Sequence, residues 1–273
     1  MDVQSRFDRT VCFSFDLDWA PDFMLADFRQ LLIETRIPAT IFYTHESPEC
    51  RKLQSLASCE VGIHPNFFKP EPPDEVLDAL LAAFPAARGV RNHVLYYHSR
   101  LLPLFHRRQI RYLSNELRFL EAGLVPHYDW SGLARLPLFW EDDVHMIYFD
   151  RDVSLQRLEL QRPGLKVFNF HPVHLYLNSR EMAYYTEHKE AIRDPRRGPE
   201  LRQRSEPGVR TLFSELVAWA REQGALATLG EVADDFRRHA AYGGNFSRYL
   251  EEADRLEARL TRGAGKGDDG ANG

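Results

Sequence analysis

The chain has 273 residues, of which 44% are hydrophobic and 27% are charged, and its formal net charge is −5. This is the composition of a folded globular protein, and the acidic balance argues against binding to nucleic acid or to an anionic membrane. The three cysteines show no metal-ligand spacing and form no even set for disulfides. Because the first residues lack the apolar core of a signal peptide and no run has transmembrane length, we expect a cytoplasmic protein.

The first predicted element is a buried strand that ends in two carboxylates. The run from Val11 to Trp19 is apolar, aromatic and β-branched apart from Ser14, Asp16 and Asp18. Residues two apart on a strand share a face, so both carboxylates can face one pocket. Such a pair indicates a site where one carboxylate binds a metal ion and the other moves a proton. The alternative is that Asp18 caps a helix and Asp16 is a solvated strand end.

Strands and helices alternate along the rest of the chain. Helical spacing of apolar residues predicts helices over residues 21–36, 48–57, 73–84, 101–108, 209–223 and 230–241. Further strands are predicted over residues 38–44, 60–64, 89–93, 110–115, 133–139, 144–148, 165–170 and 225–229. This order predicts an α/β fold with a parallel sheet, as a barrel or a doubly wound sheet. We expect one domain over residues 1–262 and a disordered tail over residues 263–273, which are rich in Gly and polar residues.

Polar side chains follow many of the predicted strands. Parallel α/β folds build their sites at the carboxyl ends of strands, so these side chains are expected to meet. They are Asp16, Asp18, His64, Arg91, His93, Ser114, Asn115, Glu141, Asp142, Asp143, His171 and His174.

Five of these residues together suit the hydrolysis of an amide. Asp18 and His64 are ligand types for zinc or another divalent transition metal, which lowers the pKa of its water and polarises a carbonyl. Asp16 can accept the proton of that water, and Arg91 can hold Asp16 in its ionised form. His171 can protonate the leaving amine.

Residues 178–208 break the alternation, because they are charged and rich in Arg and Pro. A basic run of this kind usually forms a solvated face. The alternative is a lid-like insertion over the site that supplies Arg to an anionic substrate.

The ordered motifs resemble the polysaccharide deacetylase superfamily, the NodB-homology domain of carbohydrate esterase family four. The resemblance runs from about residue 10 to about residue 240 and rests on residues 13–18, 38–43, 60–64, 89–91, 168–171 and 228–232. The chain is closest to the WbmS-type subgroup, whose Asp-x-Asp-Trp, His-Pro-Asn-Phe, Arg-x-His, Trp-Glu-Asp-Asp and His-Pro-x-His signatures resemble residues here. The resemblance implies a distorted (β/α) barrel with about seven parallel strands. It also implies metal-dependent removal of acetyl groups from sugars, with Asp16 as base, Asp18 and His64 as ligands, Arg91 as partner of the base and His171 as acid.

The chain departs from the superfamily at one metal ligand. The usual second histidine, four residues after the first, is replaced by Phe68. His93, Asn66 or a carboxylate of residues 141–143 can take its place. We prefer His93 because imidazole restores the usual ligand type, and Asn66 is the alternative nearest to His64 in sequence. Phe68 and Trp19 are then expected to line an apolar pocket.

Further substrate contacts are expected from Trp140, Glu141, Asp142 and His174, which the signatures above include. Residues 129–130 compete with residues 140–143 for the fourth motif of the superfamily.

The sequence therefore predicts a metal-dependent hydrolase of a C–N amide bond in an N-acylated sugar, sugar nucleotide or related small metabolite. Zn²⁺ is the expected ion, with Co²⁺, Ni²⁺ and Fe²⁺ as alternatives. Two other functions stay open: a hydrolase of a cyclic imide, ureide or formamide, and a non-catalytic carbohydrate-binding barrel that has lost its metal. We expect no nucleic-acid or membrane partner, and the sequence leaves a homo-oligomer open.

Overall fold

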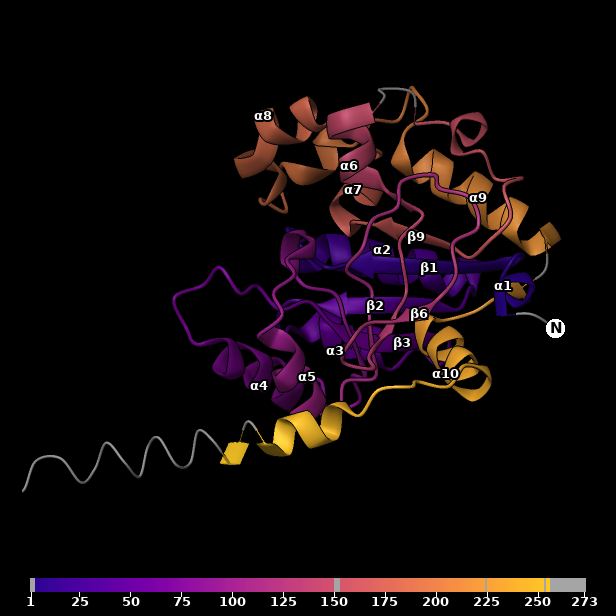
Figure 1. Cartoon of the computed structure of the whole chain (residues 1–273). Helices are drawn as coiled ribbons and strands as arrows, with labels where there is room; N and C mark the ends of the chain where they lie inside the picture. The colour runs from indigo at the N-terminus through magenta and orange to yellow at the C-terminus, as the bar shows by residue number, and fades with distance from the viewer. Residues whose placement is uncertain (1–2, 150–152, 224, 253, 256–273) are drawn as a thin grey trace, which may run out of the picture.

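The computed structural model describes residues 3–149, 153–223, 225–252 and 254–255 (Figure 1). The predicted tail over residues 263–273 lies outside the described residues. The strands are β1 (Thr10–Asp16), β2 (Ala39–Tyr43), β3 (Cys59–Ile63), β4 (Gly89–Val90), β5 (Tyr112–Leu113), β6 (His127–Tyr128), β7 (Ala134–Arg135), β8 (Trp140–Glu141), β9 (Lys166–Phe170) and β10 (Ala225–Leu226).

The helices surround the sheet (Figure 1). The α-helices are α1 (Val3–Arg6), α2 (Asp22–Thr35), α3 (Pro48–Gln54), α4 (Pro73–Ala83), α5 (Leu101–Arg107), α6 (Asp142–Val144), α7 (Pro172–Leu177), α8 (Met182–Ile192), α9 (Val209–Gln223) and α10 (Leu229–His239). The 3₁₀ turns are η1 (His93–Leu95), η3 (Leu155–Leu158) and η4 (Gly198–Leu201), and η2 (His145–Phe149) is a π-helix. None of the described helices is long and apolar enough to cross a bilayer.

The strands form one strongly curled sheet in the order β6-β7-β5-β4-β3-β2-β1-β9-β8, with β10 beside the start of β1. All neighbouring strands are parallel except β6 and β7. One segment, residues 134–141, joins the two ends of this order. Its start pairs with β5 as β7, and its end pairs with β9 as β8.

Backbone hydrogen bonds follow the change of partner along this segment. Leu136 N donates to Leu113 O at 2.9 Å, Leu138 N donates to Glu116 O at 2.8 Å, and Phe139 N donates to Val167 O at 2.9 Å. The sheet therefore closes into a distorted barrel built from β1, β2, β3, β4, β5, residues 134–141 and β9. The predicted barrel of about seven parallel strands is confirmed.

Successive side chains of a strand point to opposite faces of the sheet, so one core lies between the sheet and the surrounding helices and a second lies inside the barrel. Phe13 and Phe15 of β1 pack outward against Phe213 of α9, with ring centroids 5.6 and 5.9 Å from that of Phe213. Cys12 of β1 belongs to the inner core with Phe236 of α10. Helix α10 thus fills the amino end of the barrel and leaves the carboxyl end of the strands for a site.

One predicted strand is wrong. Residues 144–148 form the end of α6 and most of η2. Ile147, Tyr148 and Phe149 have strand propensity, but their side chains are 48%, 74% and 57% exposed, so no sheet face covers them.

The basic segment after β9 is folded onto the barrel. Residues 182–192 form α8, and Arg202 pairs with Asp27 of α2 at 2.7 Å, beside the pair that Arg210 of α9 makes with the same carboxylate. The cation of Arg202 is therefore used in packing. A lid role for residues 178–208 stays a prediction.

Candidate active site

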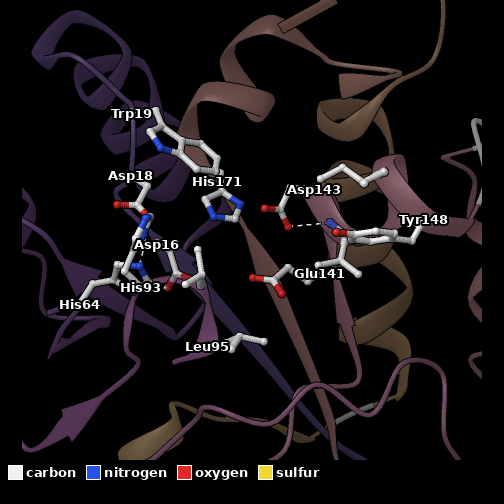
Figure 2. A pocket seen from close by; sticks show the side chains of 13 residues that line it. Asp16, Asp18, Trp19, His64, His93, Leu95, Glu141, Asp143, Tyr148 and His171 are labelled. Carbon is white, nitrogen blue, oxygen red and sulfur yellow. Dashed lines mark hydrogen bonds and ion pairs between the residues drawn. The ribbon is translucent and has the colours of Figure 1, made fainter. Parts of the chain in front are cut away.

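A cavity of about 320 Å³ opens at the carboxyl ends of the strands (Figure 2). Its polar side chains belong to β1 and β8, or to the segments that directly follow β1, β3, β4, β8 and β9. The lining residues are Asp16, Asp18, Trp19, His64, His93, Val94, Leu95, Glu141, Asp143, Val144, Ile147, Tyr148 and His171.

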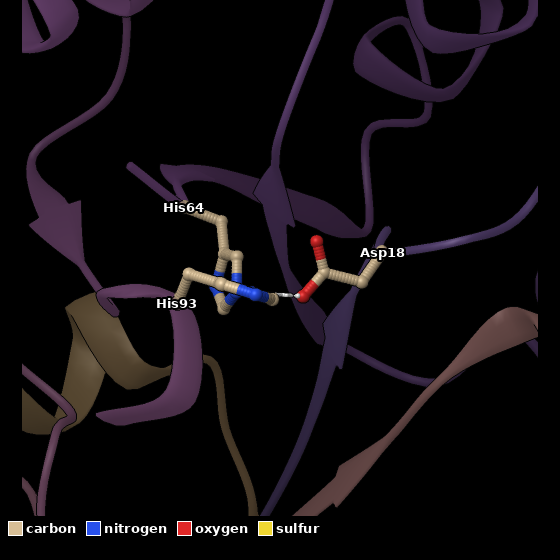
Figure 3. Close-up of side chains that lie close together, drawn as sticks. All are labelled: Asp18, His64 and His93. Atoms are coloured by element: carbon tan, nitrogen blue, oxygen red, sulfur yellow. Dashed lines mark hydrogen bonds and ion pairs between the residues drawn. The ribbon is translucent and has the colours of Figure 1, made fainter. Parts of the chain in front are cut away.

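One side of the cavity gathers two imidazoles and a carboxylate (Figure 3). The distance to Asp18 Oδ2 is 2.9 Å from His64 Nε2 and 2.8 Å from His93 Nδ1. Burial alone raises the pKa of Asp18, but the two histidines outweigh burial and hold that pKa well below its usual value. The hydrogen bond to Asp18 raises the pKa of His93.

This donor set fits a divalent transition metal, because two imidazoles, one carboxylate and open positions are a common catalytic zinc arrangement. Both ring nitrogens of His64 are buried, and neither has a partner in good hydrogen-bond geometry within the described part of the chain, although Nε2 lies 2.9 Å from Asp18 Oδ2. A buried imidazole that meets a carboxylate without a well-aligned hydrogen bond is consistent with a metal ligand. Two other donor groups include His171, but its Nδ1 is already bonded to Asp142.

Asp16 lies between the Asp18–His64–His93 group and the far wall of the cavity (Figure 2). Its Oδ1 accepts a hydrogen bond from Arg91 Nη1 at 3.1 Å, and its Oδ2 accepts one from Asn169 Nδ2 at 2.9 Å. Arg91 is fully buried, and Ser114 accepts from its Nε and Nη2. The carboxylate of Asp16 is therefore fixed in orientation beside a permanent positive charge, as a general base requires.

His171 faces Asp16 from the end of β9. Its Nδ1 lies 2.7 Å from Asp142 Oδ1, and its backbone N donates to Asp142 Oδ2 at 2.8 Å. Burial lowers the pKa of His171, but the carboxylates of Asp142 and Asp143 outweigh burial and raise that pKa well above its usual value. The Trp19 ring stacks on the imidazole at a centroid distance of 5.0 Å. His171 is thus an oriented imidazole whose two neighbouring carboxylates favour its protonated form, which suits a general acid.

Two further carboxyl groups line the wall next to His171 (Figure 2). Burial and the charge of Asp143 raise the pKa of Glu141 to about 8. Burial also raises the pKa of Asp143. Glu141 Oε1 accepts a hydrogen bond from Asn169 Nδ2 at 2.9 Å, so one amide links Glu141 to Asp16.

Several predicted site residues do not line the cavity. Phe68 is 63% exposed and packs against Tyr96, because the chain after Pro65 turns outward. Asn66 borders a neighbouring cavity, and its Oδ1 accepts from Phe68 N at 3.0 Å.

Three more predicted residues lie beneath the surface of the site, as the buried Arg91 does. Asp142 is fully buried behind His171. Trp140 is also buried, and its Nε1 donates to His145 Nδ1 at 3.0 Å. His174 packs under Trp19, and burial lowers the pKa of His174 to about 4. These three are placed to support the site from behind, while Trp19 and Glu141 line it.

Asn169 is a site residue that the sequence reasoning missed. Its amide contacts Asp16, Glu141, Arg91 and Ser14. The signal was present, since Asn169 is an amide inside an apolar strand and lies two residues before His171, on the same face.

Apolar side chains line the mouth of the cavity. Val94 and Leu95 follow His93, and Ile147 and Tyr148 come from the π-helix η2. Trp19, Val94 and Leu95 have left-handed backbones with φ of 62°, 51° and 53°. Such backbones are sparsely populated by residues other than Gly and Asn, and they concentrate at functional sites.

The chain is similar in sequence and in fold to known polysaccharide deacetylases. The WbmS-like polysaccharide deacetylase family matches residues 13–189. A solved structure of a putative polysaccharide deacetylase involved in O-antigen biosynthesis, from Bordetella bronchiseptica, is 32% identical, with a TM-score of 0.72 over 78% of this chain and 92% of that chain. A putative polysaccharide deacetylase from Mycobacterium smegmatis shares the fold at 15% identity, with a TM-score of 0.53 over 86% of this chain and 94% of that chain. No curated protein sequence matches. The chain belongs to the polysaccharide deacetylase family, in its WbmS-like group.

Proposed function

We propose that the protein is a metal-dependent hydrolase that removes the acetyl group from the nitrogen of an N-acetylated sugar, sugar nucleotide or related small metabolite in the cytoplasm. One observation carries the proposal: Asp16, with both oxygens held by donors, lies between the Asp18–His64–His93 group and the imidazole of His171. Family membership supports it.

Asp18, His64 and His93 would hold the ion, with Zn²⁺ expected and Co²⁺, Ni²⁺ and Fe²⁺ as alternatives. The bound ion would supply a water of lowered pKa and polarise the acyl carbonyl. Asp16 accepts the proton of the attacking water on a carboxylate oxygen, and the hydrogen bond from Arg91 holds that carboxylate in place. His171 would donate a proton from its Nε2 to the departing amine nitrogen, since its Nδ1 is bonded to Asp142.

The walls of the cavity suit a small polar substrate with an apolar part. Glu141 and Asp143 are placed to hydrogen-bond sugar hydroxyl groups, and Trp19 offers a ring beside His171. Leu95 and Ile147 give the cavity apolar surface that a methyl group can contact.

The test is release of acetate from a panel of N-acetylated sugars and sugar nucleotides, with cyclic imides, ureides and formamides in parallel. Asp16→Asn keeps the size and removes the base, so the turnover number is expected to fall about 10²- to 10⁴-fold. Full turnover by this variant contradicts the assigned base. Turnover of only the imide, ureide or formamide set favours the alternative hydrolase.

Metal content separates the enzyme from a binding barrel. The purified protein is expected to hold about one divalent ion per chain, and the His64→Ala variant is expected to lose that ion. A wild-type protein that takes up no zinc, cobalt or nickel favours the non-catalytic barrel.

A further inference from the structure

The loop that carries His93 has an unusual backbone. It runs from Asn92 to Tyr96, and its central residues Val94 and Leu95 both have left-handed backbones, with φ of 51° and 53°. A β-branched valine rarely adopts this conformation, and such backbones persist only where the surroundings hold them. Val94 is 65% exposed, so packing of its own side chain does not explain its backbone.

Two buried amide side chains hold the ends of this loop together. Asn115, which follows β5, accepts a hydrogen bond from Asn92 N on its Oδ1 at 2.8 Å and donates from Nδ2 to Tyr96 O at 2.8 Å. Asn92 Nδ2 donates to the same carbonyl at 2.7 Å. The start and the end of the loop are thus tied by three hydrogen bonds from Asn92 and Asn115, which we call the amide clamp.

The loop is also tied to the other metal-binding histidine. His93 N donates to the carbonyl of Pro65, the residue after His64, at 3.0 Å. With the backbone of His93 fixed at this point and the loop closed by the amide clamp, the imidazole is directed at Asp18 Oδ2, 2.8 Å away. Asn92 and Asn115 do not line the cavity themselves.

We propose that the amide clamp is a positioning device for His93, and that it forces Val94 and Leu95 into left-handed backbones so that the imidazole joins Asp18 and His64. The inference rests on the proposed metal site and adds Asn92 and Asn115 to it. The competing explanation is that the two amides stabilise a surface loop and do nothing for metal binding.

Asn115→Asp tests the amide clamp with almost no change in size. The new carboxylate still accepts from Asn92 N, but it cannot donate to Tyr96 O. We expect the zinc dissociation constant of the chelator-stripped protein, measured by competition with a chromophoric chelator, to rise about 10- to 100-fold, as when outer partners of a ligand are lost. The visible absorption of the Co²⁺-substituted protein is expected to change as well, because the ligand geometry changes.

Asn178→Asp is the matched control. Asn178 is also a buried amide that clamps a loop, since its Nδ2 donates to Gln203 O and Glu206 O at 3.1 and 3.0 Å and its Oδ1 accepts from Arg210 N at 3.0 Å. It lies outside the cavity lining. This variant is expected to lose thermal stability while its zinc affinity and cobalt spectrum stay those of the wild type.

A double-mutant comparison separates positioning from general stability. In a His93→Ala background, Asn115→Asp is expected to cause no further loss of zinc affinity, because the clamp acts only through His93. Wild-type zinc affinity in Asn115→Asp, or an equal further loss in the His93→Ala background, overturns the inference and leaves the proposed function standing. A wild-type protein that binds no ion overturns the proposed function and this inference together.

Discussion

The proposed acid role of His171 depends on one buried carboxylate. Asp142 is fully buried, holds the imidazole by its Nδ1 and raises the pKa of His171. We predict that Asp142→Asn lowers the turnover number about 10²- to 10⁴-fold. The acid form of His171 disappears as pH rises through its pKa, so the alkaline limb of the pH–rate profile is expected to move to lower pH in the variant.

The control for this prediction is Asp143→Asn. Asp143 also raises the pKa of His171 by its charge, but no hydrogen bond joins the two. We expect a smaller shift of the alkaline limb in this variant. An alkaline limb that stays in place in Asp142→Asn contradicts the assignment of His171 as the acid.

Glu141 is a carboxyl group whose folded environment favours its neutral form. Its pKa rises from 4.5 to about 8, so the folded state binds a proton that the unfolded state has released between those values. By linkage, the free energy of unfolding falls as pH rises through this window. Glu141→Gln keeps an acceptor for Asn169 and cannot ionise.

We therefore predict that Glu141→Gln is more stable than the wild type at pH 8, by about 1–3 kcal/mol, and that the difference shrinks toward pH 5. Urea unfolding at both values of pH measures the effect. Equal pH dependence of the two proteins contradicts a neutral Glu141.

The loop from Asn92 to Tyr96 has a backbone that its own residues disfavour. A left-handed backbone at a residue other than Gly costs of order 1–3 kcal/mol, and Asn tolerates it better than Val. We predict that Val94→Asn raises the free energy of unfolding by about 1 kcal/mol. Ile33→Asn, at a residue 41% exposed in α2, is the control and is expected to lower it. A destabilised Val94→Asn contradicts the stored strain.

How far the sequence predicts each element depends on how local its cause is. The strands ending at Asp16 and His64 could be predicted, because apolar runs and the carboxylates or imidazoles after them are local signals. The π-helix η2 could not be predicted, because Ile147 and Tyr148 have strand propensity. Their exposure becomes visible only once the barrel is closed without them. The left-handed backbone of Val94 could not be predicted either, since the proposed cause is Asn115, which follows a different strand.

The site follows the same division. The ends of parallel strands meet, so grouping Asp18, His64 and His93 follows from topology alone. That Phe68 points outward and that Asn169 links Asp16 to Glu141 depend on turns and register that no sequence pattern gives.

Across the whole molecule, the candidate site and helix α10 lie at opposite ends of the barrel. Gly230 N in the first turn of α10 donates to Glu60 Oε2 at 2.7 Å, and a Cβ at Gly230 would lie 2.3 Å from Glu60 Oε1. Glu60 cannot move freely, because Thr40 and Tyr112 donate to the same carboxylate. We predict that Gly230→Ala lowers the free energy of unfolding by about 1–3 kcal/mol.

The zinc affinity and turnover of Gly230→Ala are expected to equal those of the wild type, because helix α10 lies at the amino end of the strands, away from the candidate site. Helix propensity alone predicts the opposite sign, a gain of about 1 kcal/mol. Unfolding in urea decides between the two, and a stabilised variant contradicts the close packing of α10 on Glu60.

The closure of the barrel by residues 134–141 bears on the order in which the parts of the site form. The proposed metal ligands all come from the first 93 residues, through β1 to β4, whereas Glu141, Asp142 and His171 arrive only with β8 and β9. Strand β9 pairs with β1 across about 155 residues of chain, and pairing over such separations is slow. During synthesis or refolding, the half of the protein that binds the ion can form before the half that supplies the acid, so metal uptake should precede the recovery of turnover.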